Sequence, residues 1–420
     1  METREKIIII GGGFAGLQLA KTLNNRNKKV IVLDRVNHHM FQPLFYQVAC
    51  GRIEPSNISF PFRKIFQQSR NTQFRLTEVK EIDPANNKVI TDEAEFTYDK
   101  LVIATGCKTN FFGNKDMESR AFGMKNTQEA ISIRNHVLMT FEKLILEKSR
   151  SDDGNWNIVI VGSGPTGVEL AGAFAEMKKE ILPRDYPYMN FDQLKIILVS
   201  STEKPLAVMS SEAQEKSEKY LKDLGVTFLS GEVVTDYDGN KVYTKSGKDI
   251  PSNNVIWAAG VTGNVVGGFP EEKLVKNRYI VDRFNKIKGY DNIYAVGDIS
   301  YMETPKYPKG HPQVANVAIN QAKNLGRNLL KKNQNDWVEY EYKDKGSLAT
   351  IGKHRAVVDL TFMKFQGFLA WYFWMFLHLM LILSVRNKIA IFFNWMWSYF
   401  NKDSSLRLII SPNKKNDTLQ

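Results

Sequence analysis

The sequence predicts an α/β protein with two Rossmann-like dinucleotide-binding domains and a C-terminal amphipathic helical region. Three observations support this prediction. Two glycine-rich turns, 11–16 and 162–167, each follow a short apolar run and precede a helical pattern. Three further apolar runs end in small residues such as Ala-Gly or Gly-Asp. The last part of the chain, residues 346–420, is rich in aromatic and basic residues.

The first module begins with a strand at 6–10, followed by a helix at 17–23 and a strand at 30–33. Gly11 permits the tight turn, Gly13 leaves room for a pyrophosphate, and Gly16 lets the helix approach the sheet. The phosphates are expected at the helix N-terminus, where free N–H groups favour negative charge. Asp34 ends the second strand, where its carboxylate is placed to bind ribose hydroxyls.

The second module repeats this pattern with strands at 157–161 and 195–199 and a helix at 168–177. Gly162, Gly164 and Gly167 take the same three roles. Ser200 stands where a ribose-binding carboxylate is expected, and Glu203 follows it. A hydroxyl there admits a 2′-phosphate, whereas Glu203 disfavours one, so NADH is favoured and NADPH remains the alternative. Two such sites in one chain indicate a tightly held FAD and an exchangeable nicotinamide, a pairing that needs no catalytic triad.

Three buried strands are expected at 101–103, 255–257 and 293–296. They run into Ala104-Thr105-Gly106, Ala258-Ala259-Gly260 and Gly297-Asp298, where the backbone can approach a ligand closely. A loop at 302–312 and a helix at 314–330 follow. We therefore expect an FAD-binding domain at 1–125 plus 280–345, an NAD(P)H-binding domain at 126–279, and a membrane-anchoring region at 346–420.

Composition excludes several classes of protein. The net charge of +12 implies an anionic partner, but no zinc pattern or base-reading helix is present, so nucleic acid is not expected. Cys50 and Cys107 are the two cysteines, which rules out a disulfide framework and a C-x-x-C pair. The six histidines, including His38 and His39, are interpreted as surface or structural residues, and no metal site is predicted. No signal peptide pattern precedes the first strand, so the body of the protein is expected in the cytoplasm.

The C-terminal region carries an uncharged run at 365–385 and a second aromatic stretch at 389–400, with basic residues on the flanks. This composition favours an amphipathic, monotopic anchor on an anionic bilayer surface. A spanning helix and a buried core or dimer helix stay open as alternatives.

Together, the two glycine turns, Asp34, the stretch 37–49 (Asn-His-His-Met-Phe-Gln-Pro-Leu-Phe-Tyr-Gln-Val-Ala), Ala104-Thr105-Gly106, 162–169 and 295–298 resemble type II NADH:quinone oxidoreductases over essentially the whole chain. The resemblance implies non-covalent FAD and transfer of a hydride from NADH to FAD. It also implies transfer of two electrons to a membrane quinone (ubiquinone or menaquinone) in a respiratory chain, without proton pumping. A homodimer bound peripherally to the cytoplasmic side of the cell inner membrane is expected on the same basis.

The resemblance also assigns residues. Asp34 would hold the FAD ribose, Asp298 would lie near the ribityl–phosphate part, and Glu169 would orient the nicotinamide or relay a proton. The quinone-side helix of the family usually reads Ala-Gln-x-Ala-x-Gln, whereas here Asn316 and Asn320 replace both glutamines; Gln313 and Gln321 are neighbours that could share their task. Pro43, Leu44 and Val79 would line the flavin or adenine site. The remaining predicted cofactor contacts are Phe14, Ala15, Arg35, Ala104, Thr105, Gly106, Pro165, Thr166, Ala259, Gly260, Gln313, Val314 and Ala315.

Two other functions are considered. A sulfide:quinone reductase-like enzyme would need a cysteine pair across the flavin, for which Cys50 and Cys107 are the candidates. A non-catalytic NAD(P)H-sensing membrane flavoprotein would not need Glu169 or a quinone-side helix.

Overall fold

The computed structural model describes residues 4–147, 154–401 and 406–410, and these form two compact units. Unit 1 contains residues 1–40, 59–108 and 261–343. Unit 2 contains residues 41–58, 109–260 and 344–420. Each unit has its own parallel sheet with the strand order of a Rossmann-like module, which confirms the predicted α/β fold with two such modules.

The sheet of unit 1 has the order β21-β9-β1-β2-β5, and all neighbours are parallel. Its central strands β1, β2 and β9 are apolar along most of their length because both faces are covered, whereas the edge strand β5 exposes Gln73 and Arg75. Ile7 and Ile9 of β1 point to the face on which helices α1 and α9 pack, whereas Ile8 and Ile10 point to the opposite core. The bounds are β1 Lys6–Ile10, α1 Phe14–Leu23, β2 Lys29–Asp34, β5 Thr72–Leu76, β9 Lys100–Ile103, β21 Ile293–Ala295 and α9 Ala315–Leu329.

Short antiparallel and mixed sheets complete unit 1. One meander, β6-β7-β8, supplies Ile82 and Val89 to the core beneath the parallel sheet. The remaining elements are β3 His38–Met40, β4 Ser59–Pro61, α3 Phe62–Ile65, β6 Val79–Asp83, β7 Lys88–Thr91, β8 Glu95–Thr97, β18 Val261–Gly263, β19 Leu274–Val275, β20 Arg278–Val281 and β22 Ser300–Met302.

The sheet of unit 2 has the order β13-β12-β11-β17, again parallel. Val159 and Val161 of β11 face a core shared with the meander β14-β15-β16. A π-helical turn, Met177–Ile181, continues α6. The bounds are β11 Ile158–Val161, α6 Pro165–Glu176, α7 Leu182–Asp185, β12 Ile196–Val199, α8 Ser211–Asp223, β13 Thr227–Leu229, β14 Val234–Tyr237, β15 Lys241–Thr244, β16 Asp249–Pro251 and β17 Asn254–Trp257, with α4 Lys115–Arg120 and α5 Thr127–Glu147 before them. The short strand β10, Cys107–Thr109, contains the point where the chain passes from unit 1 to unit 2.

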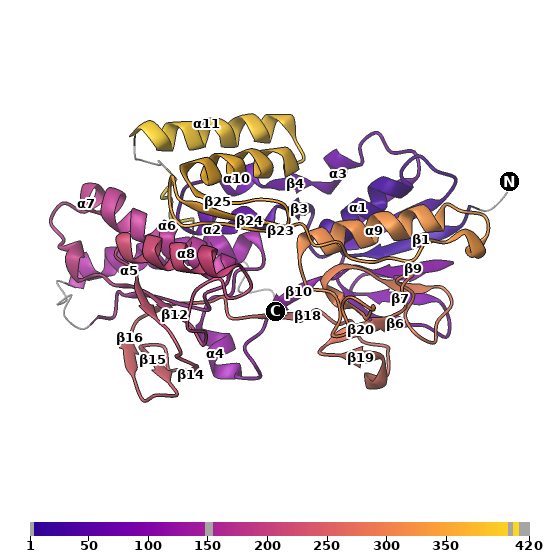
Figure 1. Ribbon diagram of the computed structural model, residues 1–420. Coiled ribbons are helices and arrows are strands. Elements are labelled where there is room, and N and C mark those ends of the chain that lie inside the picture. Colours follow the sequence, from indigo (N-terminus) through magenta and orange to yellow (C-terminus); the bar gives the residue numbers. More distant parts are fainter. Residues whose placement is uncertain (1–3, 148–153, 402–405, 411–420) are drawn as a thin grey trace. The chain divides into compact units, whose positions relative to one another are not determined.

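The C-terminal part of unit 2 is an antiparallel sheet, β23-β24-β25, followed by helices α10 and α11, which lie side by side (Figure 1). Gly172 of α6 permits the approach of the turn after β23, since a Cβ there would lie 2.7 Å from the Gly352 nitrogen. Helix α2, from the segment 41–58, also packs in this unit. The bounds are α2 Phe45–Ala49, β23 Gly346–Thr350, β24 Ala356–Leu360, β25 Lys364–Gly367, α10 Phe368–Leu381 and α11 Val385–Asn401.

The uncharged run at 365–385 is divided between several elements. Its first residues belong to β25, Gly367 turns the chain at φ 83°, and α10 ends at Leu381. Within 4–147, 154–401 and 406–410, no helix is both long enough and apolar enough to cross a bilayer.

Candidate active site

The first glycine turn of unit 1 has the open backbone that a pyrophosphate needs. Gly11 adopts φ 97°, and a Cβ there would lie 2.4 Å from the Ala104 oxygen. A Cβ at Gly16 would collide with the Gly11 oxygen at 1.8 Å. A Cβ at Gly13 would instead stand in open space. The first and third glycines therefore serve packing, while Gly13 leaves room at the N-terminus of α1, which fits a bound dinucleotide.

Asp34 closes this turn from the end of β2. Its carboxylate accepts hydrogen bonds from the backbone N–H of Gly12 at 2.6 Å and of Val36 at 2.9 Å. Burial raises the pKa of Asp34, and these two hydrogen bonds together with the charge of Arg35 oppose that rise. His39 supports the turn from the other side, with Nδ1 3.0 Å from the Gly12 oxygen, and burial lowers its pKa to about 4, so it is neutral near pH 7.

The Gly297–Asp298 turn is fixed by the side chains of Gln313 and Gln321. The Gln321 carbonyl accepts from the Gly297 N–H at 2.7 Å, and Gln313 donates to the Asp298 backbone oxygen at 3.0 Å. The Cys107 thiol donates to the Asp298 carboxylate at 3.0 Å. Gln321 is fully buried, so it holds the turn in place and is not exposed to a substrate.

Asn316 and Asn320 lie one turn apart on α9, as their spacing predicts. The Asn320 amide donates to the Asn316 backbone oxygen at 2.8 Å. Both residues are partly buried. Within the part of the chain that the structure describes, the Asn320 side chain makes no other hydrogen bond, so its amide keeps hydrogen-bonding capacity for a ligand.

The second glycine turn, in unit 2, repeats the geometry of the first. Gly162 adopts φ 104°, and a Cβ there would lie 2.6 Å from the Ala259 Cα. A Cβ at Gly167 would collide with the Gly162 oxygen, whereas one at Gly164 would meet nothing within 4 Å. The open position again lies at a helix N-terminus, that of α6. This turn therefore also has room for a phosphate group at a helix N-terminus.

Hydroxyl groups occupy the position beside this turn where a ribose-binding acid is usual. The Ser200 hydroxyl lies 2.6 Å from that of Ser163 and 2.9 Å from that of Thr202. Glu203 is exposed next to them, and the nearby Lys204 is paired with Glu215 at 2.8 Å. The position after β12 therefore offers the hydroxyls of Ser200 and Thr202 and the carboxylate of Glu203. Lys204 is already paired with Glu215 and is not free to bind a phosphate.

Glu169 lies on the second turn of α6, and its side chain is partly buried. The backbone N–H of Thr350 donates to its Oε1 at 3.5 Å. Burial raises its pKa to about 8, and the Thr350 hydrogen bond opposes the rise. The carboxyl group is therefore largely protonated near neutral pH and able to give up a proton.

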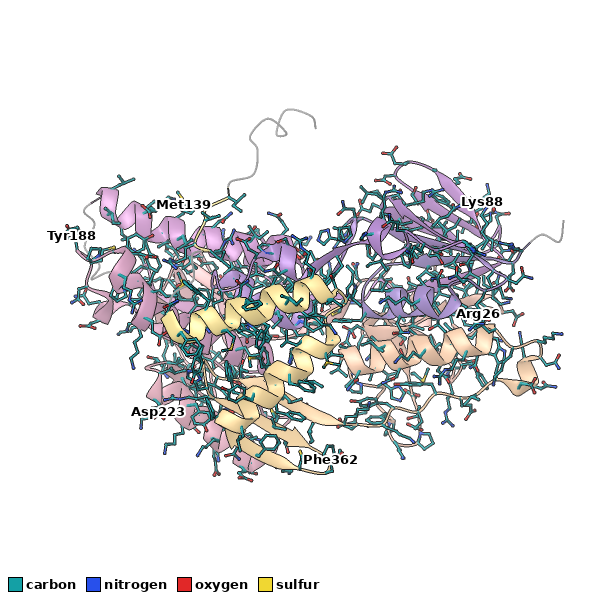
Figure 2. The ribbon with its side chains drawn as sticks, turned by 90° about the horizontal axis from the view of Figure 1, so that it is seen from above. Arg26, Lys88, Met139, Tyr188, Asp223 and Phe362 are labelled. Atoms are coloured by element: carbon teal, nitrogen blue, oxygen red, sulfur yellow. The ribbon has the colours of Figure 1, made fainter. Side chains whose placement is uncertain are left out.

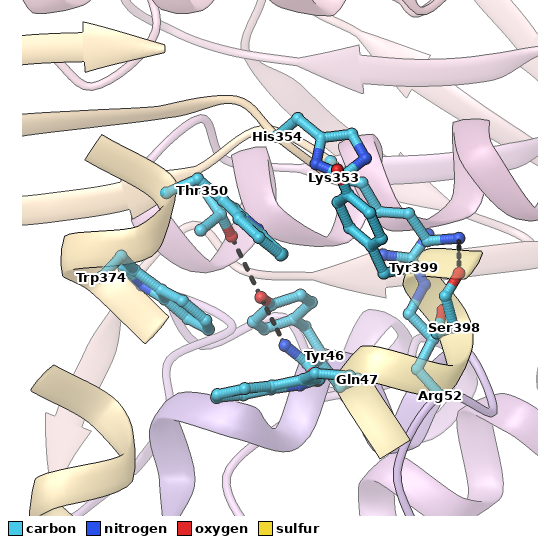
Figure 3. A pocket seen from close by; sticks show the side chains of 12 residues that line it. Tyr46, Gln47, Arg52, Thr350, Lys353, His354, Trp374, Ser398 and Tyr399 are labelled. Atoms are coloured by element: carbon cyan, nitrogen blue, oxygen red, sulfur yellow. Dashed lines mark hydrogen bonds between the residues drawn. The ribbon is translucent and has the colours of Figure 1, made fainter. Parts of the chain in front are cut away.

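A chain of hydrogen bonds leads from Thr350 towards α11. The Thr350 hydroxyl lies 3.0 Å from the Tyr46 hydroxyl, and Gln47 donates to Tyr46 at 2.9 Å. Trp395 of α11 donates its indole N–H to the Gln47 carbonyl at 2.8 Å. Figure 3 shows Tyr46 between Thr350 and Gln47.

These residues line a cavity under α10 and α11 (Figure 3). Its polar side includes Arg52, which is paired with Glu176, and Lys353, whose Nζ lies 3.0 Å from Glu180. The Trp374 N–H is buried and has no hydrogen-bond partner among the described residues. The lining residues are Tyr46, Gln47, Arg52, Thr350, Gly352, Lys353, His354, Trp371, Trp374, Trp395, Ser398 and Tyr399.

Sequence reasoning did not single out Thr350, and it noted Tyr46 only as part of a longer stretch. Nothing local marks Thr350, which ends a short strand far from Glu169 in sequence. Tyr46 and Gln47 carried a signal, because two polar groups sit inside an otherwise apolar run, Leu44–Ala49. A buried polar group needs a partner, so such a run points to a polar network.

Comparison with known protein families gives two matches. Residues 5–322 match the family model described as pyridine nucleotide-disulphide oxidoreductase, and residues 345–402 match the NDH2 C-terminal domain. The chain is 31% identical to the type II NADH:quinone oxidoreductase Ndh of Mycobacterium tuberculosis, over 95% of this chain and 89% of that protein. It is 26% identical to the type II NADH:quinone oxidoreductase of Staphylococcus aureus, over 85% of this chain and 90% of that protein.

Solved structures show the same fold. NDH2 of Plasmodium falciparum in complex with NADH matches with a TM-score of 0.89 at 21% identity, over 97% of this chain and all of that one. The sulfide:quinone oxidoreductase of Aquifex aeolicus matches with a TM-score of 0.72 at 20% identity, over 97% of this chain and 96% of that one. At these identities the likeness shows the fold alone.

Proposed function

The chain belongs to the type II NADH:quinone oxidoreductases, within the pyridine nucleotide-disulphide oxidoreductase family, and we propose that it catalyses their reaction with FAD on unit 1 and NADH on unit 2. The observation that carries the proposal is the pair of glycine turns, each with one glycine facing open space at a helix N-terminus. The predicted domain boundaries near 125, 280 and 345 stay part of the proposal.

FAD binds non-covalently at the first turn in this proposal. Gly13 admits the pyrophosphate, and Asp34 exchanges part of its hydrogen bonding to Gly12 and Val36 for the ribose hydroxyls. Asp298, held by Gln313 and the turn, faces the ribityl–phosphate part. When bound, FAD accepts the hydride of NADH and supplies two electrons to the quinone.

NADH binds at the second turn, with its pyrophosphate over Gly164. Ser200 and Thr202 offer hydroxyls to the adenosine ribose. Glu203 disfavours a 2′-phosphate because the two groups are both negatively charged, and Lys204 is already paired with Glu215. NADH is therefore preferred over NADPH.

Quinone reduction takes up one proton from the medium, since NADH supplies one hydride and the quinol carries two hydrogens. Glu169 fits this task because its raised pKa keeps it protonated at neutral pH. Thr350, whose backbone N–H donates to Glu169, lines the cavity together with Trp395 and Tyr399 of α11. Asn316 and Asn320 supply amides for a quinone carbonyl on the flavin side in this proposal.

The outer sides of α10 and α11 supply the membrane contact. Large apolar side chains are exposed on both helices, which favours insertion into the interface between headgroups and acyl chains. With the basic flanks, this surface indicates monotopic attachment to an anionic bilayer, on the cytoplasmic side of the inner membrane. A homodimer is expected from the family resemblance. The exposed side chains are Phe368, Leu369, Tyr372, Phe376, Met380, Leu381, Leu383, Val385, Ile389, Phe392, Phe393, Trp397 and Phe400.

The test uses FAD-loaded protein and measures oxidation of NADH and NADPH with and without a short-chain quinone. Rapid quinone-dependent oxidation of NADH supports the proposal. Flavin reduction that quinone does not reoxidise would favour the sensing flavoprotein instead. Quinone reduction driven by sulfide and not by NADH would favour the sulfide:quinone reductase.

Two matched variants separate the sites. Gly13→Ala and Gly164→Ala each place a methyl group in open space, so both chains fold. Gly13→Ala should lose FAD, whereas Gly164→Ala should keep FAD and lose NADH affinity. The reverse pattern would overturn the assignment of the two cofactors.

A further inference from the structure

Phe112 combines a disfavoured backbone with an exposed aromatic ring. Its φ is 52°, in the left-handed region that bulky residues rarely adopt. Its side chain is 68% exposed, although burial of a phenyl ring is favourable. A strained and exposed aromatic residue contributes little to the stability of the fold, and strained residues of this kind cluster at ligand-binding sites.

A set of hydrogen bonds holds Phe112 in this conformation. The Asn110 side-chain oxygen accepts from the Phe112 N–H at 2.8 Å. Asn110 is itself tied to the end of β17, because its N–H donates to the Gly260 oxygen at 3.1 Å and its own oxygen accepts from the Trp257 indole at 2.7 Å. The loop is therefore fixed to the sheet at the point where β17 ends.

The ring rests on the backbone that follows β17. A Cβ added to Gly260 would lie 3.3 Å from the tip of the Phe112 ring. The Trp257 ring stands edge-on to it, with centroids 6.4 Å apart and an interplanar angle of 65°. Trp257 thus supports the ring from one side, and solvent covers much of the rest.

The sheet topology says which half of a dinucleotide lies there. A dinucleotide binds outside the carboxyl ends of the strands, where the strand order reverses. In the order β13-β12-β11-β17, that point lies between β11 and β17, next to the open Gly164 that follows β11. Ser200 follows β12 on the adenosine side, so the nicotinamide half lies on the β17 side, with Gly260 and Phe112.

We propose that Phe112 packs its ring against the nicotinamide–ribose half of bound NADH and positions it for hydride transfer. The inference rests on the proposed function. It adds a positioning residue on the nicotinamide side of the sheet, whereas the hydroxyls of Ser163, Ser200 and Thr202 lie on the adenosine side. The strained backbone is retained because it presents the ring to the ligand.

The experiment compares Phe112→Ala and Phe112→Tyr with Phe362→Ala, which removes a comparably exposed ring from the tip of the β24–β25 hairpin (Figure 2). Two quantities are measured on the FAD-loaded protein: the KM for NADH, and the inhibition constant of ADP-ribose, which has the adenosine half and both phosphates but no nicotinamide. Phe112→Ala should raise the KM about tenfold, the scale of one lost ring stack, and leave the ADP-ribose constant unchanged. Phe112→Tyr and Phe362→Ala should both behave as wild type.

An unchanged KM in Phe112→Ala, or a parallel rise of the KM and the ADP-ribose constant, would overturn the proposal. Phe112→Gly guards against a folding defect, because glycine adopts φ 52° without strain. Phe112→Gly should raise the KM for NADH as much as Phe112→Ala does, and its melting temperature should be no lower than that of the wild type. A large fall in melting temperature would show that the ring stabilises the fold, which would overturn the proposal. A wild-type enzyme that does not oxidise NADH would overturn the proposed function instead.

Discussion

Replacing Glu169 with Gln tests the most perturbed acid of the proposed site. The change keeps the shape of the side chain and removes its ability to ionise. Burial raises the pKa of Glu169 from its ordinary value of 4.5 to about 8. Since one pKa unit is about 1.4 kcal/mol, the ionised carboxylate in the folded protein is disfavoured by up to about 5 kcal/mol relative to water.

The direction of the pH dependence follows from this raised pKa. The folded protein holds the proton more tightly than the unfolded chain, so the favourable contribution of Glu169 is complete below about pH 4.5 and is lost as the pH rises to about 8. The wild-type protein therefore loses free energy of unfolding across this range, and Glu169→Gln does not suffer that loss. Urea denaturation of the FAD-loaded proteins at pH 5.5 and 8.5 measures the difference, which should approach several kcal/mol in favour of the variant at the higher pH.

Catalysis gives an independent readout of the same group. If Glu169 gives up a proton during turnover, the wild-type rate should fall above about pH 8, and Glu169→Gln should lose both that dependence and much of the rate. Glu118→Gln, which alters an exposed acid on α4, is the matched control and should change neither measurement. Equal pH dependence of stability in the wild type and Glu169→Gln would refute the reasoning, because it would mean that Glu169 ionises as it does in water.

Three further predictions concern other parts of the molecule. Tyr46→Phe removes the hydroxyl that pairs with Thr350 and accepts a hydrogen bond from Gln47. Because those buried groups are then left unpaired, the free energy of unfolding measured with urea should fall by about 1–3 kcal/mol. A fall below about 0.5 kcal/mol would contradict the network. Trp397→Glu should weaken binding to anionic vesicles at least about tenfold in co-sedimentation, because it places a negative charge where an exposed ring would enter the lipid headgroup region. Undiminished binding would exclude α11 as the membrane contact. Glu203→Arg should raise kcat/KM for NADPH at least about tenfold by replacing a repelling group with a phosphate ligand, whereas an unchanged value would place the 2′-position elsewhere.

The sequence was a good guide to the two modules because the signals there are local. A buried parallel strand needs four or five apolar residues, and the close approach of a helix to a strand needs glycine at a fixed distance. The sequence places Gly11 and Gly16 at those distances, and the structure shows a Cβ at either position colliding with backbone oxygen. Ile7–Ile10 therefore reads as a strand without any knowledge of what packs on it.

The network around Glu169 was not predictable in the same way. Thr350 and Tyr46 are 304 residues apart in sequence, and no periodic pattern connects them. The division of the uncharged run at 365–385 was also missed, because strand pairing of β25 with β24 is a tertiary effect that outweighs the helical preference of the residues. At the acid position, the sequence showed that Ser200 replaces a carboxylate, but not that its hydroxyl is paired with those of Ser163 and Thr202.

The same network gives a physical reason for the C-terminal region to fold with the second module. Arg52 and Glu176 form a buried ion pair, and removing one partner of such a pair typically costs about 3–5 kcal/mol. The Glu176 carboxylate also accepts from the Lys353 backbone, so α6, the segment 41–58 and the turn after β23 share one buried charge. Glu169 lies on the same helix as Glu176, two turns before it. If α10 and α11 rest on the bilayer, as proposed, the depth of Glu169 below the membrane surface is set by buried polar contacts rather than by a flexible tether. A fixed depth suits the proposed role of Glu169 in relaying a proton for the reduction of a quinone that arrives from the lipid.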